Sequence, residues 1–189
     1  MTPARHLVSV WNPAYAVDAM DAHVAVLVER ARAHRRGEIS EDEVHVWWGL
    51  VRSARRQDEL PHLPDVLELD SQIEADVPTY LYLTDYNSLY VADVARVTVD
   101  NIRSKGEDAV PDYYKSLECD LWFRLWDIRR LVAQVTRAAV QKLRHLRNTR
   151  YHDQPVSLCG GVVELPLVVW RERLVMAEYI ETLAGRLTE

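Results

Sequence analysis

One stretch, residues 80–97, constrains the fold of this chain more than any other, because it has the pattern of a β-hairpin. Leu81 and Leu83 alternate with Tyr and Thr residues, which is the period of two expected of a strand with one buried face. Residues 85–88 follow with turn chemistry, since Asp and Asn side chains hydrogen-bond to nearby backbone. An extended pattern then resumes with Leu89, Val91 and Val97. We expect two paired strands, with the leucines in the core and the tyrosine face open to a flat ligand.

The remaining segments predict a mixture of strands and helices. Further strands are expected at residues 7–11, 44–51, 121–126 and 162–170. Helices are expected at residues 18–36, where Asp18 or Asp21 caps the first turn, and at residues 66–73, 133–147 and 172–186. Ser40 and Glu43 have capping-box spacing, but the alternation that begins at Val44 favours a strand, so we expect no cap there. Short connections between strands favour an antiparallel sheet or small barrel, and hence an α+β fold.

Length and charge limit the classes of function. The chain has 189 residues, which suits one domain with a small appendage. Its net charge of −6 counts against a general nucleic-acid binder, whose affinity rests on basic residues at phosphates. The arginines nevertheless form clusters in the sequence, so the negative net charge does not exclude a locally basic face. No apolar run approaches the length of a membrane span and no signal peptide is evident, so we expect a cytoplasmic protein without membrane contact, with Cys119 and Cys159 reduced.

Motifs for common catalytic and cofactor sites are missing from the sequence. The seven histidines and two cysteines lack zinc-ligand spacing, and no phosphate-binding glycine loop or nucleophile elbow is present, so we expect no metal, no cofactor and no catalytic constellation. One alternative stays open. Arg147 and His152 stand in an Arg-polar-x-x-x-His pattern that resembles the motif of HEPN ribonucleases, in which Arg and His act on a phosphodiester. The purely structural interpretation of the same residues is a basic helix end followed by a loop.

Aromatic residues carry the stronger functional signal. Six tryptophans and nine tyrosines stand against one phenylalanine, and Trp and Tyr combine a flat ring with a hydrogen-bonding edge. Trp11 with Asn12, Trp47, and the turn from Tyr82 to Ser88 place such rings beside polar groups. Rings of this kind stack on nucleobases, and Asn or Asp can read the hydrogen-bonding edge of a base.

Several segments resemble the PUA-like superfamily, most closely its EVE branch, which is related to YTH and SRA readers. The resemblance rests on residues 8–13, 46–51, 80–85, 88–97 and 121–129. It implies a mixed β pseudo-barrel flanked by helices over residues 1–171, with an acidic insertion at about residues 58–78 and an additional C-terminal helix at residues 172–189 that suits oligomerisation.

The resemblance also implies a function: a non-enzymatic reader that holds a flipped, modified base in an aromatic pocket. The best candidate is 5-methylcytosine in DNA, with N6-methyladenine as the second. Carried over to this sequence, the pocket residues are Trp11, Asn12, Trp47, Tyr82, Asp85, Tyr86 and Ser88. The expected phosphate contacts are Arg52, Arg55, Arg56, Arg147 and Arg150. Expected partners are methylated DNA, a separate nuclease and a second copy of the chain. Alternatives are the HEPN-like ribonuclease with Arg147 and His152, and an oligomeric interaction module that binds no nucleic acid.

Overall fold

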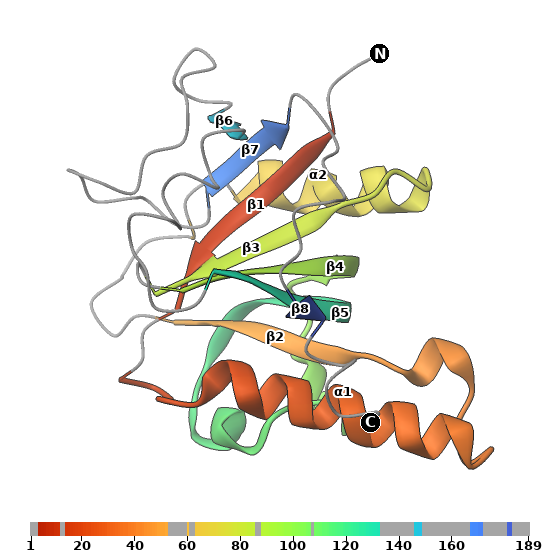
Figure 1. The fold of residues 1–189 in the computed structure, drawn as a ribbon. Coiled ribbons are helices and arrows are strands. Elements are labelled where there is room, and N and C mark those ends of the chain that lie inside the picture. The colour runs from red at the N-terminus through yellow and green to blue at the C-terminus, as the bar shows by residue number, and fades with distance from the viewer. Residues whose placement is uncertain are drawn as a thin grey trace.

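A mixed β-sheet with two α-helices forms the frame of the protein (Figure 1). The computed structural model describes residues 4–11, 14–52, 60, 63–85, 88–106, 108–132, 146–148, 167–171 and 181–182. The strands among these residues are β1 (Arg5–Val10), β2 (Val46–Val51), β3 (Tyr80–Thr84), β4 (Leu89–Thr98), β5 (Cys119–Val132), β6 (Leu146–Asn148), β7 (Leu167–Arg171) and β8 (Glu181–Thr182).

The strand order is β2-β5-β4-β3-β1-β7-β6, and β8 pairs with β5 outside this path. β1 and β3 run parallel, whereas the other neighbouring strands are antiparallel. Because β3 follows β1 only after two helices and another strand, the parallel pair brings the ends of distant segments together. The sheet is therefore mixed, and the α+β class expected from the sequence is confirmed.

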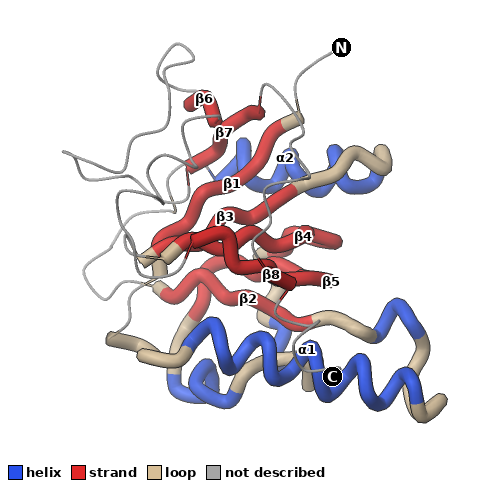
Figure 2. The backbone as a smooth tube through the Cα atoms, viewed as in Figure 1, coloured by secondary structure: helices blue, strands red, loops and turns tan. Residues whose placement is uncertain are grey.

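Two helices lie at opposite ends of the sheet (Figure 2). α1 (Ala19–Arg35) packs on β2 and β5, and α2 (Leu63–Glu74) packs on β4 and β1. α1 buries Val24, Leu27 and Val28, which lie on one helical stripe. The chain leaves α1 through Gly37 at φ 74°, a left-handed conformation that favours glycine. Among the described helices, none is long and apolar enough to cross a bilayer.

The predicted hairpin is confirmed, but its tyrosine face is not open. β3 and β4 pair antiparallel, and Leu81 and Leu83 are fully buried. Tyr80 and Tyr82, on the opposite face of the strand, are each only 5% exposed. Their rings pack beside His6, at centroid distances of 5.1 and 6.3 Å. The expectation that this tyrosine face is open is therefore wrong, because both faces of this sheet are covered.

Other local expectations need correction. The capping box of Ser40 and Glu43 is real, and it opens a short 3₁₀ helix (Glu41–Glu43) before β2 begins. By contrast, the helix expected at residues 66–73, within the stretch expected as an acidic insertion, is confirmed as α2, whose Val66 and Leu69 are buried in the main core. The helix expected at residues 133–147 lies mostly outside the described residues, but its end belongs to strand β6.

The two remaining C-terminal expectations also fall largely outside the described residues. Of the strand expected at residues 162–170, the part from Leu167 onward is described and forms β7, which pairs with β1. Of the helix expected at residues 172–189, only Glu181 and Thr182 are described, and they form β8 beside β5. Two further 3₁₀ helices, Ile102–Lys105 and Asp112–Ser116, lie between β4 and β5.

Candidate functional site

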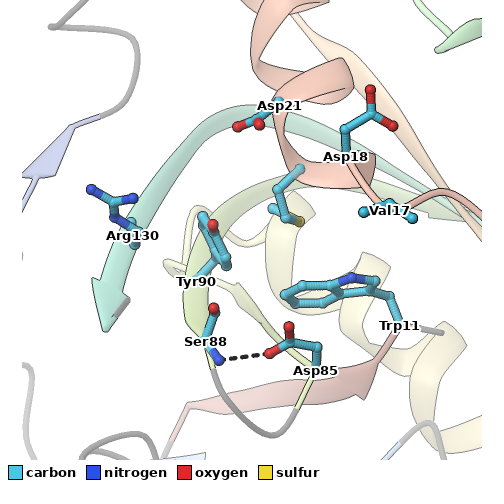
Figure 3. A pocket seen from close by; sticks show the side chains of 9 residues that line it. Trp11, Val17, Asp18, Asp21, Asp85, Ser88, Tyr90 and Arg130 are labelled. Carbon is cyan, nitrogen blue, oxygen red and sulfur yellow. Dashed lines mark hydrogen bonds between the residues drawn. The ribbon is translucent and has the colours of Figure 1, made fainter. Parts of the chain in front are cut away.

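A cavity of about 480 Å³ lies where the end of β1, the first turn of α1 and the β3–β4 turn meet (Figure 3). Its volume falls within the range of small-molecule binding sites in proteins. The described residues that line it are Trp11, Val17, Asp18, Met20, Asp21, Asp85, Ser88, Tyr90 and Arg130. They come from three regions of the sequence, residues 11–21, residues 85–90 and Arg130, so the cavity is a product of the tertiary fold.

One backbone hydrogen bond joins the two loops that form one side of the cavity, and two bonds that involve side chains order the β3–β4 turn. The backbone N–H of Trp11 donates to the carbonyl oxygen of Thr84 at 3.0 Å, which ties the exit of β1 to the end of β3. The backbone N–H of Ser88 donates to Oδ1 of Asp85 at 2.6 Å, and Oγ1 of Thr84 donates to the carbonyl oxygen of Ser88 at 2.7 Å. The turn chemistry predicted for residues 85–88 is thus present, and it fixes the Asp85 carboxylate at the cavity.

Two neighbouring rings hold the indole of Trp11 in an edge-to-face arrangement. Its ring centroid lies 5.7 Å from that of Tyr90, at an interplanar angle of 67°, and 6.5 Å from that of Trp48, at 77°. Trp48 is itself buried and packs on His23 at a centroid distance of 4.5 Å. Such pairs add to the energy of burial and restrict ring orientation. Trp11 is therefore half-buried, and its indole is held in one orientation by its neighbours.

His23 packs against Trp48 and so supports this aromatic cluster from the core side. Its Nδ1–H donates to the carbonyl oxygen of Ala19 at 2.7 Å, and the whole side chain is buried. Burial lowers the pKa of His23 to about 4, which is only partly offset by hydrogen bonds to the backbone of Ala19 and Trp47. The imidazole is therefore neutral at pH 7, and we assign it a structural role.

Carboxylates dominate the charge of the cavity. Among its described lining residues, three are aspartates (Asp18, Asp21 and Asp85) and one is an arginine, Arg130. Burial raises the pKa of Tyr90. The negative charges of Asp21 and Asp85 raise this pKa further, whereas Arg130 lowers it through its positive charge and a hydrogen bond. No group of three or more His, Cys, Asp or Glu side chains in the described part of the chain is placed to hold a metal ion. The cavity therefore presents two rings and several hydrogen-bond acceptors to a ligand.

The structure brings three of the seven predicted pocket residues to this cavity: Trp11, Asp85 and Ser88. Asn12 and Tyr86 lie outside the described residues, although each directly follows a lining residue in the sequence.

Trp47 and Tyr82 do not line the cavity. Trp47 is 3% exposed and packs in a second core cluster with Tyr114 and Trp122. Successive residues of a strand point to opposite faces, so Trp48 rather than Trp47 lies beneath Trp11. Tyr82 is buried beside His6.

Sequence reasoning did not predict the other six described lining residues as ligand contacts. Tyr90 and Arg130 are register partners on β4 and β5, a pairing that the sequence alone does not define. Asp18 and Asp21 were expected only as helix-capping residues, and Asp18 does stand at the N-cap position of α1. Its side chain makes no capping hydrogen bond, however, which leaves the carboxylate at the cavity.

Few of the predicted phosphate-binding arginines can be placed. Nε of Arg52 donates to Oδ1 of Asp120 at 2.6 Å, so this guanidinium is already in an ion pair. Arg147 stands in the backbone of strand β6, and its side chain is not described. Arg55, Arg56, Arg150 and the HEPN candidate His152 lie outside the described residues.

Comparison with known proteins identifies the family. A family model described as Pua-like matches residues 24–154, which is more than half of the chain. The match includes Asp85, Ser88, Tyr90 and Arg130, whereas Trp11 and the first turn of α1 precede it. Neither the curated proteins nor the solved structures that were searched contain a match to the chain. The fold and the family match agree, and the chain belongs to the Pua-like family, whose domains bind nucleic acid.

Proposed function

We propose that this protein is a reader of modified DNA that holds an extruded, methylated base in the cavity that Trp11 and Tyr90 line. The observation that carries the proposal is the cavity itself, where a half-buried indole held by two other rings stands beside carboxylate acceptors. Within the Pua-like family, we favour the EVE branch on the segments that resemble it. The role is binding, and strand cleavage belongs to a separate nuclease partner.

Stacking supplies the general affinity in this proposal. A base that stacks on an aromatic side chain gains about 1–3 kcal/mol, whatever its identity. Trp11 is suited to this role because its edge contacts with Tyr90 and Trp48 fix the plane of the ring before a ligand enters. Preorganisation of this kind lowers the entropic cost of binding.

The carboxylates supply selectivity among bases. Asp and Glu side chains accept hydrogen bonds from amino groups such as N4 of cytosine. Asp85 is held at the cavity by its bond to Ser88, and Asp18 and Asp21 face the cavity from α1. Cytosine and adenine carry an exocyclic amino group, whereas thymine does not. We therefore place 5-methylcytosine first and N6-methyladenine second among the bases read.

Phosphate contacts require positively charged side chains, whereas the net charge of the chain is negative, at −6. Arg130 is the lining residue suited to a phosphate beside the extruded base. The five arginines predicted from the sequence remain candidates for the flanking phosphates. Self-association of the chain would raise avidity for DNA by combining two weak sites.

Fluorescence anisotropy tests the function with three labelled duplexes of one sequence: unmodified, with 5-methylcytosine, and with N6-methyladenine. Wild-type protein is expected to bind at least one methylated duplex more tightly than the unmodified duplex. Trp11→Ala is expected to lose about tenfold or more in affinity, from the stacking energy given above. Trp126→Ala is the matched control, because Trp126 is 56% exposed and does not line the cavity.

Two further results complete this test. Trp11→Phe keeps an aromatic ring and should retain most of the binding, and thermal melting shows whether Trp11→Ala remains folded. Equal or absent binding to all three duplexes would reject the function. Loss of binding in Trp126→Ala but not in Trp11→Ala would move the site away from the cavity.

A further inference from the structure

We infer that the cavity prefers a positively charged base, alkylated on a ring nitrogen, over the neutral methylated isomer of the same base. This inference rests on the proposed function and names the chemical class of its ligand. The geometry behind it is the combination of two aromatic rings with three carboxylates and one arginine in one cavity. Neither a neutral base nor a phosphate requires that excess of negative charge.

Asp18 and Asp21 lie on one side of the rings in Figure 3, and Asp85 lies on the other. In the view of Figure 3, the rings of Trp11 and Tyr90 lie between Asp18 and Asp21 on α1 and Asp85 on the β3–β4 turn. Within the described part of the chain, the carboxylates of Asp18 and Asp21 make no hydrogen bond or ion pair. Among the described residues, these two carboxylates are therefore in no ion pair with a protein cation.

The opposing charges are few. Arg130 is the cation among the lining residues, and it lies on β5 beside Tyr90. The hydroxyl of Tyr90 stays neutral at pH 7, because burial and the nearby Asp21 and Asp85 raise its pKa above the ordinary value of 10. At neutral pH the described lining therefore carries more negative than positive charge.

A cationic base fits both parts of this lining. The face of an aromatic ring attracts cations through its quadrupole, and Trp does so best. Carboxylates attract the same charge through space and also accept hydrogen bonds from the amino group of the base. Alkylation of a ring nitrogen makes cytosine or adenine positively charged at neutral pH and leaves the exocyclic nitrogen as a donor. Both features of the cavity thus favour this class of ligand.

Isomeric bases provide a direct test, since 3-methylcytosine and 5-methylcytosine have the same heavy atoms, but at neutral pH 3-methylcytosine carries one additional proton and a positive charge. The same holds for 1-methyladenine and N6-methyladenine. Each base is placed in a single-stranded oligonucleotide, because methylation on the pairing edge weakens a duplex and would itself ease extrusion. We expect wild-type protein to bind the cationic isomer roughly tenfold more tightly at low salt. The preference is expected to shrink as salt is raised, because exposed charges are screened.

Variants that remove the negative charges test whether the carboxylates cause the preference for the cationic isomer. In the double variant Asp18→Asn and Asp21→Asn, the ratio of the two affinities is expected to fall to about twofold or less, because the variant loses more affinity for the cationic isomer than for the neutral isomer. Asn keeps the N-cap preference of position 18, so α1 is retained. Glu74→Gln is the control, because it removes one negative charge at the end of α2, outside the lining, and should leave the ratio unchanged.

The outcomes separate this inference from the proposed function. Tight binding of neutral methylated bases with no preference for the cationic isomers overturns the inference and leaves the function standing. A preference that survives in the double variant also overturns it, because the carboxylates then do not cause it. If no methylated oligonucleotide binds more tightly than the unmodified one, the proposed function fails as well.

Discussion

Oδ1 of Asp85 accepts a hydrogen bond from the backbone N–H of Ser88 at 2.6 Å, across the turn that joins β3 to β4. One side chain thus closes the hairpin and places a carboxylate at the cavity. Both residues line that cavity with Trp11, whose own backbone N–H is bound to Thr84 at the end of β3. The stability of the turn and the shape of the binding site are therefore coupled.

Replacing Asp85 should separate these two roles. Asp85→Ala removes the acceptor for the Ser88 N–H and is expected to lower the free energy of unfolding by about 1 kcal/mol. Asp85→Asn keeps an acceptor oxygen and should unfold nearly as the wild type does, but it loses the charge. Urea denaturation of the three proteins measures the difference. An Asn variant as unstable as the Ala variant would show that charge, rather than the hydrogen bond, stabilises the turn.

Stability should depend on pH through His23. Burial lowers the pKa of His23 from 6.5 to about 4, so between these values the unfolded chain binds a proton that the folded protein excludes. The free energy of unfolding should therefore fall as the pH drops from about 6.5 to about 4, by roughly 3 kcal/mol in total. His23→Asn should show a smaller change over this range in urea denaturation at pH 7 and pH 4.5. Equal changes in both proteins would contradict the assignment.

The hydroxyl of Tyr114 is predicted to matter for stability alone. Tyr114 is 1% exposed, and its hydroxyl accepts from the backbone N–H of Gly49 at 2.9 Å and donates to the Gly49 carbonyl oxygen at 3.1 Å. Tyr114→Phe should cost about 1–3 kcal/mol, because two buried backbone groups lose their partner. Tyr15→Phe is the control, since Tyr15 is 42% exposed. Both proteins should bind DNA like the wild type at a temperature where they are folded, and a loss of affinity in Tyr114→Phe would contradict this.

Arg130 is predicted to contact a phosphate. Arg130→Ala should weaken binding to methylated and unmodified duplexes alike, and should reduce the slope of log affinity against log salt by about 0.9. Arg36→Ala is the comparison, because Arg36 lies at the end of α1 in an exposed ion pair with Glu38. Anisotropy titrations over a series of salt concentrations give both slopes. An unchanged slope in Arg130→Ala would remove this residue from the phosphate contacts.

The sequence predicted the strands with a clear period of two and the turn between them. It also led to the superfamily, which the family match supports. It could not predict which of two adjacent tryptophans lies beneath the cavity. Trp47 and Trp48 alternate on β2, and either assignment satisfies the same pattern. Only the packing of α1 and Trp11 places Trp48 on the cavity side.

Two other errors have a similar origin. Tyr82 was expected to be open to a ligand, because a strand of alternating residues ordinarily has one solvated face; here both faces are covered. Tyr90 and Arg130 meet through strand register, and a β-bulge beside this pair shifts that register. Contacts set by register between distant strands depend on the whole sheet. Local patterns therefore could not assign these residues to the cavity.

The most direct test of the central claim is an intermolecular NOE experiment. The methyl group of the base in the tightest-binding oligonucleotide is labelled with ¹³C, and contacts to protein protons are recorded in the saturated complex. The claim predicts NOEs from this methyl group to the indole protons of Trp11 and the ring protons of Tyr90, and none to Trp126. A saturated complex in which the methyl group contacts neither Trp11 nor Tyr90 would contradict it.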